Sequence, residues 1–438
     1  MDRFGATVAC LTLLGVATAP AAASAEGRRI PFAATPASLA TLREMEAAAA
    51  HRFEAALAGG QRPPIVAARA VLDAARGERA DALRRGAAGR AARTAPPRRL
   101  ADVAAALAAD EALVAFAPAD DRLHATVVAR EPVRVVDLGP AALLVERLGA
   151  LELDDETQDF AAAHDALVRD LLAPLSLPAT LRTVHVAADP TLPPLPLAWL
   201  DPTRAWTTVA SPATWLALVE RRSATPRGEG VLAVGDPTGD APDSLAARDA
   251  LAGGRASRFV PLAAARAEAR LLGDVALLGA QATEPALRRA LAVRRRWRTL
   301  LLAGHGLYDG ARPLATGFAL ALSDGDDARW TTTDVLEARP AVDVVILAAC
   351  DLGRVPWGEG EVALPFARAW LAAGAHNVVA CRWKADDDAT HALVLALDVG
   401  LRAGLAPATA LARAQAAVRA NARWSHPRFW AGWTVEGA

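Results

Sequence analysis

Two stretches, Thr299-Leu-Leu-Leu-Ala303-Gly-His305-Gly306 and Val342-Asp-Val-Val-Ile-Leu-Ala-Ala-Cys350, determine the fold that we expect for this chain. Each is a largely apolar run that ends at a reactive side chain, with glycine close behind. Such runs are typical of strands that are buried on both faces of a parallel sheet. In an open α/β sheet, functional residues gather beyond the carboxyl ends of the strands. We therefore expect His305 and Cys350, which are 45 residues apart, to lie side by side at one edge of the sheet.

A histidine beside a cysteine is the pair that a cysteine hydrolase needs. A thiol with an ordinary pKa of about 8.5 is mostly protonated at neutral pH, whereas the thiolate is the nucleophile. The imidazole of His305 would accept the thiol proton or stabilise the thiolate. The N–H groups of Gly306 and Cys350 are our candidates for the oxyanion hole, because backbone donors at tight turns are preorganised. The spacing also fits caspase-type proteases, in which the histidine lies about 50 residues before the cysteine.

Further motifs occur in a fixed order around this pair and support a family resemblance. They are Gly235-Asp236-Pro237, Ala265-Arg-Ala-Glu268-Ala, Gln281-Ala-Thr283, Gly358-Glu359-Gly360, Ala373-Gly-Ala375 and Arg382-Trp-Lys-Ala-Asp386-Asp387, with Thr390 in the helix that comes next. On these motifs, the segment from about Val231 to Trp433 resembles the CHAT domain, a bacterial branch of the caspase-like (clan CD) cysteine peptidases. The stretch Val184–Pro212 looks like the flank that precedes that domain. The resemblance implies an α/β fold with a caspase-like, mostly parallel sheet flanked by helices, and a cysteine endopeptidase with a His305/Cys350 dyad.

The residues next to the cysteine depart from the family pattern. Ala348-Ala349 stands where the family has Ser-Ala, and Asp351-Leu352-Gly353 stands where it has Glu-Thr-Gly. The caspase pentapeptide is absent, so we do not expect strict specificity for aspartate. These departures leave an alternative open, in which the chain is a catalytically silent scaffold that binds a regulatory protein partner through its helical N-terminal region.

Acidic residues near the dyad are candidates for binding a basic side chain of a protein or peptide substrate, because an opposite charge is the simplest way to select it. The candidates are Asp351, Glu359, Asp386 and Asp387. The run of three aspartates that begins at Asp386 also has a simpler interpretation as a solvated helix cap.

Single residues at the site have ordinary interpretations as well. His305 alone would be a core histidine and Cys350 alone a small buried hydrophobe, but their joint placement favours catalysis. Gly304-x-Gly306-x-x-x-Gly310 imitates a dinucleotide loop, although no helix comes after it. Cys381 ends a short apolar run and is interpreted as a packed thiol. We expect it to be too far from Cys350 for a disulfide, which needs Cα atoms within about 7 Å.

Composition narrows the classes of partner. The chain has 438 residues and a net charge of −1, so nothing indicates a nucleic acid partner. Its eight histidines and three cysteines show no zinc-ligand spacing, and we expect neither a metal nor a cofactor. Apart from the N-terminus, no run is long and apolar enough to be a candidate for membrane insertion, and we expect no stable insertion.

We expect four segments along the chain. Residues 1–25 have the features of a signal peptide, with small residues at Ala23-Ser-Ala25, and favour export to the periplasm or medium over a cytoplasmic location. The alternative is an alanine-rich leader from a mis-assigned start codon. Residues 30–95 are predicted to be helical, as a degenerate repeat, residues 100–225 to form a small α+β flank, and residues 228–438 to form the catalytic domain.

Local patterns predict the elements outside the two deciding strands. Strands are expected at 112–116, 123–129 and 133–138 as a meander, and again at 182–187. A helical stretch is expected at 141–172 and a C-terminal helix at 407–421. The aromatic residues after that helix are expected to cap the core, because they carry a large apolar area. They are Trp424, Phe429, Trp430 and Trp433.

Overall fold

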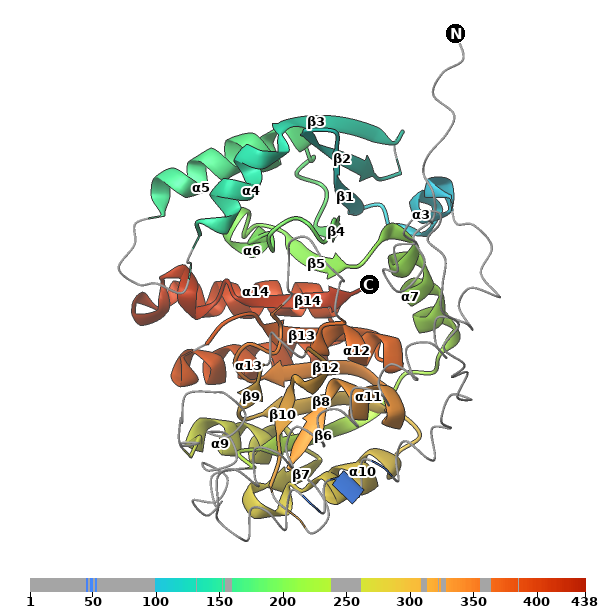
Figure 1. Ribbon diagram of the computed structural model, residues 1–438, viewed down its shortest axis with the longest axis vertical. Helices are drawn as coiled ribbons and strands as arrows, with labels where there is room; N and C mark the ends of the chain where they lie inside the picture. The colour runs from blue at the N-terminus through green and yellow to red at the C-terminus, as the bar shows by residue number, and fades with distance from the viewer. Residues whose placement is uncertain are drawn as a thin grey trace, which may run out of the picture. The chain divides into compact units, whose positions relative to one another are not determined.

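The structure is a computed structural model (Figure 1). It describes residues 99–130, 132–151, 153, 160–237, 261–308, 313–321, 323, 328–354, 364–384 and 386–438, and in addition residues 45, 48, 49 and 52. The chain divides into two compact units, Met1–Arg98 and Arg99–Ala438. The predicted signal segment lies outside the described residues, as does the predicted helical segment except for four helical positions. The elements and the candidate site all belong to the second unit.

One sheet of eleven strands runs through this unit (Figure 1). In spatial order the strands are β3 (Arg134–Pro140), β2 (Arg122–Val128), β1 (Glu111–Ala119), β4 (Thr183–Ala188), β5 (Ala205–Val209), β14 (Trp433–Gly437), β13 (Asn377–Cys381), β12 (Val342–Ala348), β8 (Trp297–Ala303), β6 (Glu229–Gly235) and β7 (Val275–Leu278). Three neighbouring pairs are antiparallel, β3 with β2, β2 with β1, and β14 with β13, and the other seven are parallel. The expected α/β class with a mostly parallel sheet is confirmed.

The central strands are continuous apolar runs because both faces of the sheet are covered. In β8, Leu301 packs into one core cluster and its neighbours Leu300 and Leu302 into the other. In β12, Ile346 and Leu347 divide in the same way. Successive side chains of a strand point to opposite faces, so a strand with two buried faces has no polar alternation.

Helices cover the two faces. On one face lie α4 (Ala141–Gly149), α5 (Ala161–Leu167), α6 (Leu197–Leu200), α9 (Ala263–Leu272), α13 (Asp387–Arg402) and α14 (Pro407–Ala420). On the other lie α3 (Leu100–Ala106), α7 (Pro212–Ala224), α10 (Glu284–Ala292), α11 (Thr332–Ala338) and α12 (Phe366–Ala373). Among the described residues, no helix is long and apolar enough to cross a membrane.

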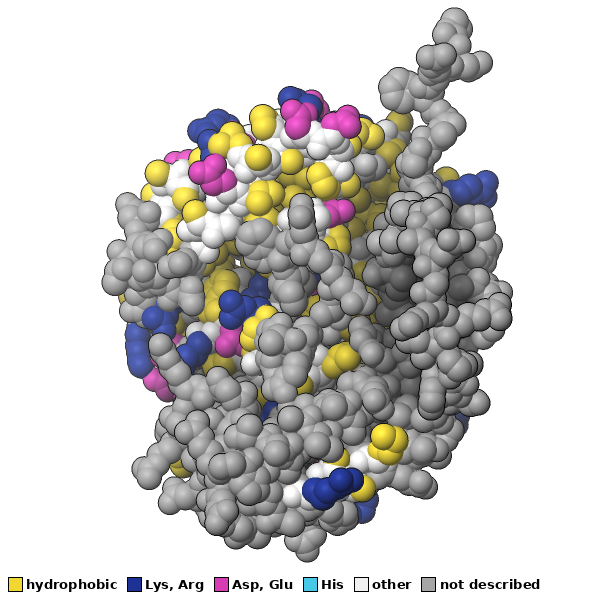
Figure 2. Space-filling model, viewed as in Figure 1, with side chains coloured by type: hydrophobic (Ala, Val, Ile, Leu, Met, Phe, Trp, Pro, Cys, Tyr) yellow, Lys and Arg dark blue, Asp and Glu magenta, His cyan; other side chains and the backbone are white. Residues whose placement is uncertain are grey.

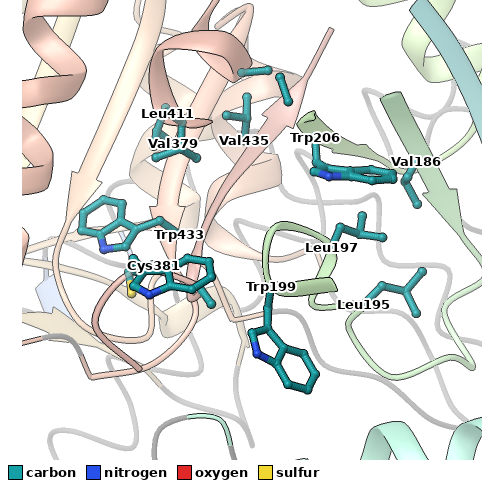
Figure 3. Packing of buried hydrophobic residues seen from close by; sticks show 14 of the residues in the cluster. Val186, Leu195, Leu197, Trp199, Trp206, Val379, Cys381, Leu411, Trp433 and Val435 are labelled. Carbon is teal, nitrogen blue, oxygen red and sulfur yellow. The ribbon is translucent and has the colours of Figure 1, made fainter. Parts of the chain in front are cut away.

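Strand β14 was not predicted, and it joins the two halves of the sheet. It pairs antiparallel with β13 over five residues, and parallel with β5 at Val435↔Thr207 and Glu436↔Thr208. Segments 100–225 and 228–438 therefore contribute to one continuous sheet. Figure 3 shows Trp433 of β14 beside Cys381 of β13, and Val435 of β14 beside Val379, in the core at this junction.

The other expected elements are found with modest differences. The meander of β1, β2 and β3 is confirmed. The stretch at 141–172 is not one helix: α4 ends at Gly149, and α5 continues into a π-helix at Val168–Leu172. Of the aromatic residues expected to cap the core, Trp430 and Trp433 are buried, whereas Trp424 and Phe429 are partly buried against the same cluster.

A second, small sheet begins directly after His305. Its strands are β9 (Gly306–Leu307), β10 (Gly317–Ala319) and β11 (Arg329–Thr331), all antiparallel. The shorter helical elements are 3₁₀ turns at Ala173–Leu175, Gly279–Gln281, Pro313–Ala315, Ala422–Trp424 and Pro427–Phe429. On the surface in Figure 2, basic and acidic side chains of the described residues are interspersed with hydrophobic ones.

Candidate active site

The register of β8 against β12 brings His305 and Cys350 to the same edge of the sheet. The strands are parallel neighbours, and Ala303 is paired with Ala348. Each candidate comes two residues after its paired alanine, so the two side chains leave the sheet at the same level. The Gly304 N–H donates to the Ala348 carbonyl (3.2 Å) and extends the pairing beyond the strand ends.

A tight turn presents Cys350. Asp351 has a φ of 61°, in the left-handed region that a residue other than glycine seldom occupies. The next residues return to the sheet: Leu352 is buried, and the Gly353 N–H donates to the Cys381 carbonyl (2.8 Å). The Cys350 side chain is partly exposed, and its sulfur is not in a disulfide. The turn therefore holds an accessible thiol against the end of β13.

The backbone after His305 is fixed on both sides. The Ala319 N–H donates to the His305 carbonyl (3.0 Å), which continues the β9–β10 pairing. Because hydrogen-bonded and non-hydrogen-bonded pairs alternate along an antiparallel ladder, the N–H of the next residue, Gly306, faces away from β10. A Cβ atom at Gly306 would lie 2.1 Å from the Cys350 carbonyl oxygen. The two loops thus touch at a point where only glycine fits.

Cys381, at the end of β13, is a packed thiol. It is buried, and burial raises its pKa to about 12. The nearby Cys350 and Asp351 add to this rise, which places all three at one end of the sheet. Cys350 and Cys381 are not joined by a disulfide. Of these two thiols, Cys350 has the exposure that a nucleophile needs.

The four acidic candidates occupy different positions. Asp386 is the N-cap of α13 and accepts a hydrogen bond from the Ala389 N–H (2.9 Å), as the helix-cap interpretation expects. Asp351 lies 3.7 Å from the Arg354 guanidinium, which also stacks over the Tyr308 ring at 5.0 Å. Glu359 lies outside the described residues.

Asp387, in the first turn of α13, is the acidic candidate whose pKa is affected by His305. Partial desolvation and the Asp386 carboxylate raise its pKa, while the charges of His305 and Lys384 lower it. The opposing effect of His305 requires the two groups to lie within electrostatic reach of each other. Asp387 therefore lies within electrostatic reach of His305. No group of three or more His, Cys, Asp or Glu residues within the described part of the chain could hold a metal ion.

Two polar pairs near this edge were not predicted from the sequence. Buried Asp236, after β6, is 3.2 Å from Arg266 of α9 and accepts a hydrogen bond from the Leu262 N–H. Buried Glu268 of α9 is 3.2 Å from Nδ1 of His391 in α13. Glu268 and His391 are 123 residues apart, and no local pattern in the sequence indicates this second pair.

The fold is a mostly parallel α/β sheet flanked by helices, and comparison with known proteins identifies the family to which the chain belongs. The chain belongs to the CHAT domain family, whose model matches residues 161–438. The resemblance inferred from the motifs is thereby confirmed.

Other proteins are similar over smaller parts or at lower identity. Tetratricopeptide repeat protein 28 of Mus musculus is 36% identical over 110 residues, which are 25% of this chain and only 4% of that protein. Among solved structures, separase in the Saccharomyces cerevisiae separase–securin complex has a TM-score of 0.39 and 14% identity, covering 64% of this chain and 17% of that chain. The complex of the pro- and mature domains of Porphyromonas gingivalis RgpB has a TM-score of 0.41 and 13% identity, covering 63% of this chain and 68% of that chain. These scores are low, and the family assignment rests on the domain match.

Proposed function

We propose that this protein is a cysteine endopeptidase, with Cys350 as the nucleophile and His305 as the general base. The observation that supports this most is the register of β8 and β12, which aligns the two residues at adjacent strand ends. The partial exposure of Cys350, against the burial of Cys381, supports the same assignment.

The chemistry divides into two steps. In the first, His305 takes the proton of the Cys350 thiol, and the sulfur attacks the carbonyl carbon of the scissile peptide bond. The N–H groups of Gly306 and Cys350 stabilise the oxyanion. His305 then gives its proton to the leaving amine, the C–N bond breaks, and a thioester remains. In the second step His305 deprotonates a water molecule, which attacks the thioester and releases the acid and the thiol.

The substrate in this proposal is a protein or peptide with a basic side chain near the scissile bond. Asp387 is the strongest of the four acidic candidates, because it lies within electrostatic reach of His305 and at an exposed position. Asp386 is occupied as a helix cap, and Asp351 already has the Arg354 guanidinium nearby. Glu359 stays a candidate on sequence grounds alone.

Cleavage of a peptide library and of a proteome by the wild type and two alanine variants tests the assignment. We expect Cys350→Ala to lose cleavage by at least about 10⁴-fold, the order of loss seen when a triad member is removed. Cys381→Ala is the matched control, since it also removes a thiol, and it should keep most of the activity. Equal cleavage by the wild type and Cys350→Ala would remove Cys350 from the mechanism.

The second candidate function is a scaffold without catalysis. Two observations favour it: the residues flanking Cys350 depart from the family pattern, and one relative is a tetratricopeptide repeat protein. In this case the N-terminal region would bind a protein partner, and Cys350 would react with alkylating reagents no faster than an ordinary thiol. We also propose the division of the chain into a leader at 1–25, a helical segment, a flank and a catalytic domain. Export of the chain is a proposal too.

A further inference from the structure

A buried carboxyl lies close to Asp387 and has not been assigned a role. Glu268 projects from α9, and its side chain is only 2% exposed. Its Oε1 is 3.2 Å from Nδ1 of His391 in α13. Its Oε2 makes no hydrogen bond to any residue that the structure describes. The carboxyl is therefore held by one partner, with its second oxygen in an apolar setting.

Two contacts fix α9 against α13 and keep Glu268 in this position. The first is the Glu268–His391 contact. The second is the hydrogen bond from the Arg402 guanidinium to the Leu272 carbonyl (2.9 Å), further along both helices. Asp387 and His391 are four residues apart in α13 and share one face of it. Glu268 therefore packs against the face of α13 that carries Asp387.

The charged groups around Glu268 come from three elements. Asp387 and His391 face it from α13, and the Asp387 carboxylate acts on it electrostatically. On its own helix, Arg266 is paired with Asp236, which comes after β6. Strands β6 and β8 contribute Ala233 and Ala303 to the same apolar cluster as α9, and His305 comes two residues after the end of β8. Among these described groups, His391 is the one whose side chain lies within hydrogen-bonding distance of Glu268.

An ionised carboxylate in such a place is unfavourable, because burial penalises the charged form and one oxygen has no donor. Burial raises the pKa of Glu268 to about 8, and the Asp387 carboxylate adds to the rise. A protonated Glu268 instead has a hydroxyl group that donates a hydrogen bond to the imidazole nitrogen of His391.

We infer that Glu268 and His391 form a neutral, proton-sharing pair that supports Asp387 from behind, so that Glu268 is a positioning residue for the acidic group within electrostatic reach of His305. The positioning role rests on the proposed function, because it concerns catalysis by His305 and Cys350. If Glu268 loses its proton, a second carboxylate lies beside Asp387, and repulsion between like charges moves the first turn of α13 away from the dyad.

The test compares the wild type with Glu268→Gln, which has nearly the same shape and is neutral at every pH. Glu146→Gln, an exposed position on α4, is the control. Infrared spectroscopy between pH 6 and about 10 follows the C=O band of a protonated carboxylic acid, and so reports the proton without any need for catalysis. We expect a band at neutral pH that disappears with a midpoint near 8 in the wild type and in Glu146→Gln, and that is missing in Glu268→Gln.

The second readout is kcat/KM for a basic peptide as a function of pH. We expect Glu268→Gln to match the wild type at pH 6.5 and to exceed it by about tenfold at pH 9, where only about a tenth of Glu268 keeps its proton. Glu268→Leu should lose activity at both pH values, since it removes the contact with His391. If Glu268 had only a structural role, the wild type and Glu268→Gln would have pH profiles of the same shape.

The two readouts separate the possible failures. Absence of the infrared band at neutral pH in the wild type, or its survival in Glu268→Gln, overturns the neutral pair whatever the enzyme does. A band that behaves as expected, with parallel pH profiles for wild type and Glu268→Gln, overturns the positioning role. If no peptide is cleaved at all, the proposed function fails, and the infrared result still decides the protonation of Glu268.

Discussion

Replacing Gly306 with alanine should damage the site more than the fold. The new Cβ atom would lie 2.1 Å from the Cys350 carbonyl oxygen, 3.0 Å from Leu352 Cγ and 3.2 Å from the Cys350 carbonyl carbon. An ordinary contact starts at 3.4 Å, so the two loops must separate by roughly 1 Å. Overpacking of this kind typically costs about 1–3 kcal/mol in the free energy of unfolding. A shift of about 1 Å between catalytic groups costs on the order of 10²-fold in rate.

The assay measures kcat/KM, the alkylation rate of Cys350 and the free energy of unfolding in urea. Gly400→Ala is the matched control, because its Cβ would also be crowded, at 2.9 Å from Ala410 Cβ. Gly400 lies near the far end of α13, about 20 Å from Asp387 along the helix axis. We expect Gly306→Ala to lose about 10²-fold in kcat/KM and Gly400→Ala to keep its activity. Full activity and unchanged stability of Gly306→Ala would refute the contact between the two loops.

Two further predictions concern the acidic groups. Asp387→Asn should lower kcat/KM for peptides with arginine or lysine by roughly 10- to 150-fold, the value of one charged hydrogen bond, and spare neutral peptides. Asp388→Asn, at a residue paired with Arg423 on the surface, is the control, and an equal loss on both classes of peptide would contradict the assignment. For stability, the rise in the pKa of Glu268 from 4.5 to about 8 means that the folded state holds this proton more tightly. As the pH rises from 4.5 to 8, the free energy of unfolding of the wild type, measured in urea, should therefore fall by up to about 5 kcal/mol relative to that of Glu268→Gln. A difference in unfolding free energy that stays constant with pH would contradict the raised pKa of Glu268.

The part of the site built on β8 and β12 could be predicted from the sequence because local patterns determine it. Each strand is an apolar run with both faces buried, and each ends at a reactive residue with glycine close behind. In a parallel pair, aligned strand ends result from the sheet itself. The packed state of Cys381 and the capping role of Asp386 also result from local patterns, and the structure has both.

The features that could not be predicted from the sequence depend on contacts between distant residues. Trp433-Thr-Val-Glu-Gly437 becomes strand β14 only through its partners β13 and β5, and β5 is more than 200 residues away along the chain. Because tryptophans lie around the start of this segment, its sequence predicts a group of aromatic side chains that cover the core, and not a strand. Glu268 and His391 are 123 residues apart, and neither is unusual in its own segment. Such pairs are set by how α9 packs against α13, and no periodicity in either helix reveals it.

The most direct test of the proposed dyad is the rate at which each thiol reacts with iodoacetamide, measured by mass spectrometry of the peptides. Buried Cys381 is the internal reference, and the unfolded chain gives the rate of an ordinary thiol. An activated nucleophile exists largely as the thiolate at neutral pH and needs its histidine. We predict that Cys350 reacts at pH 6 faster than in the unfolded chain, that His305→Ala removes this advantage, and that Cys381 stays unmodified. A Cys350 that reacts no faster than in the unfolded chain, with or without His305, would contradict the catalytic role of the pair.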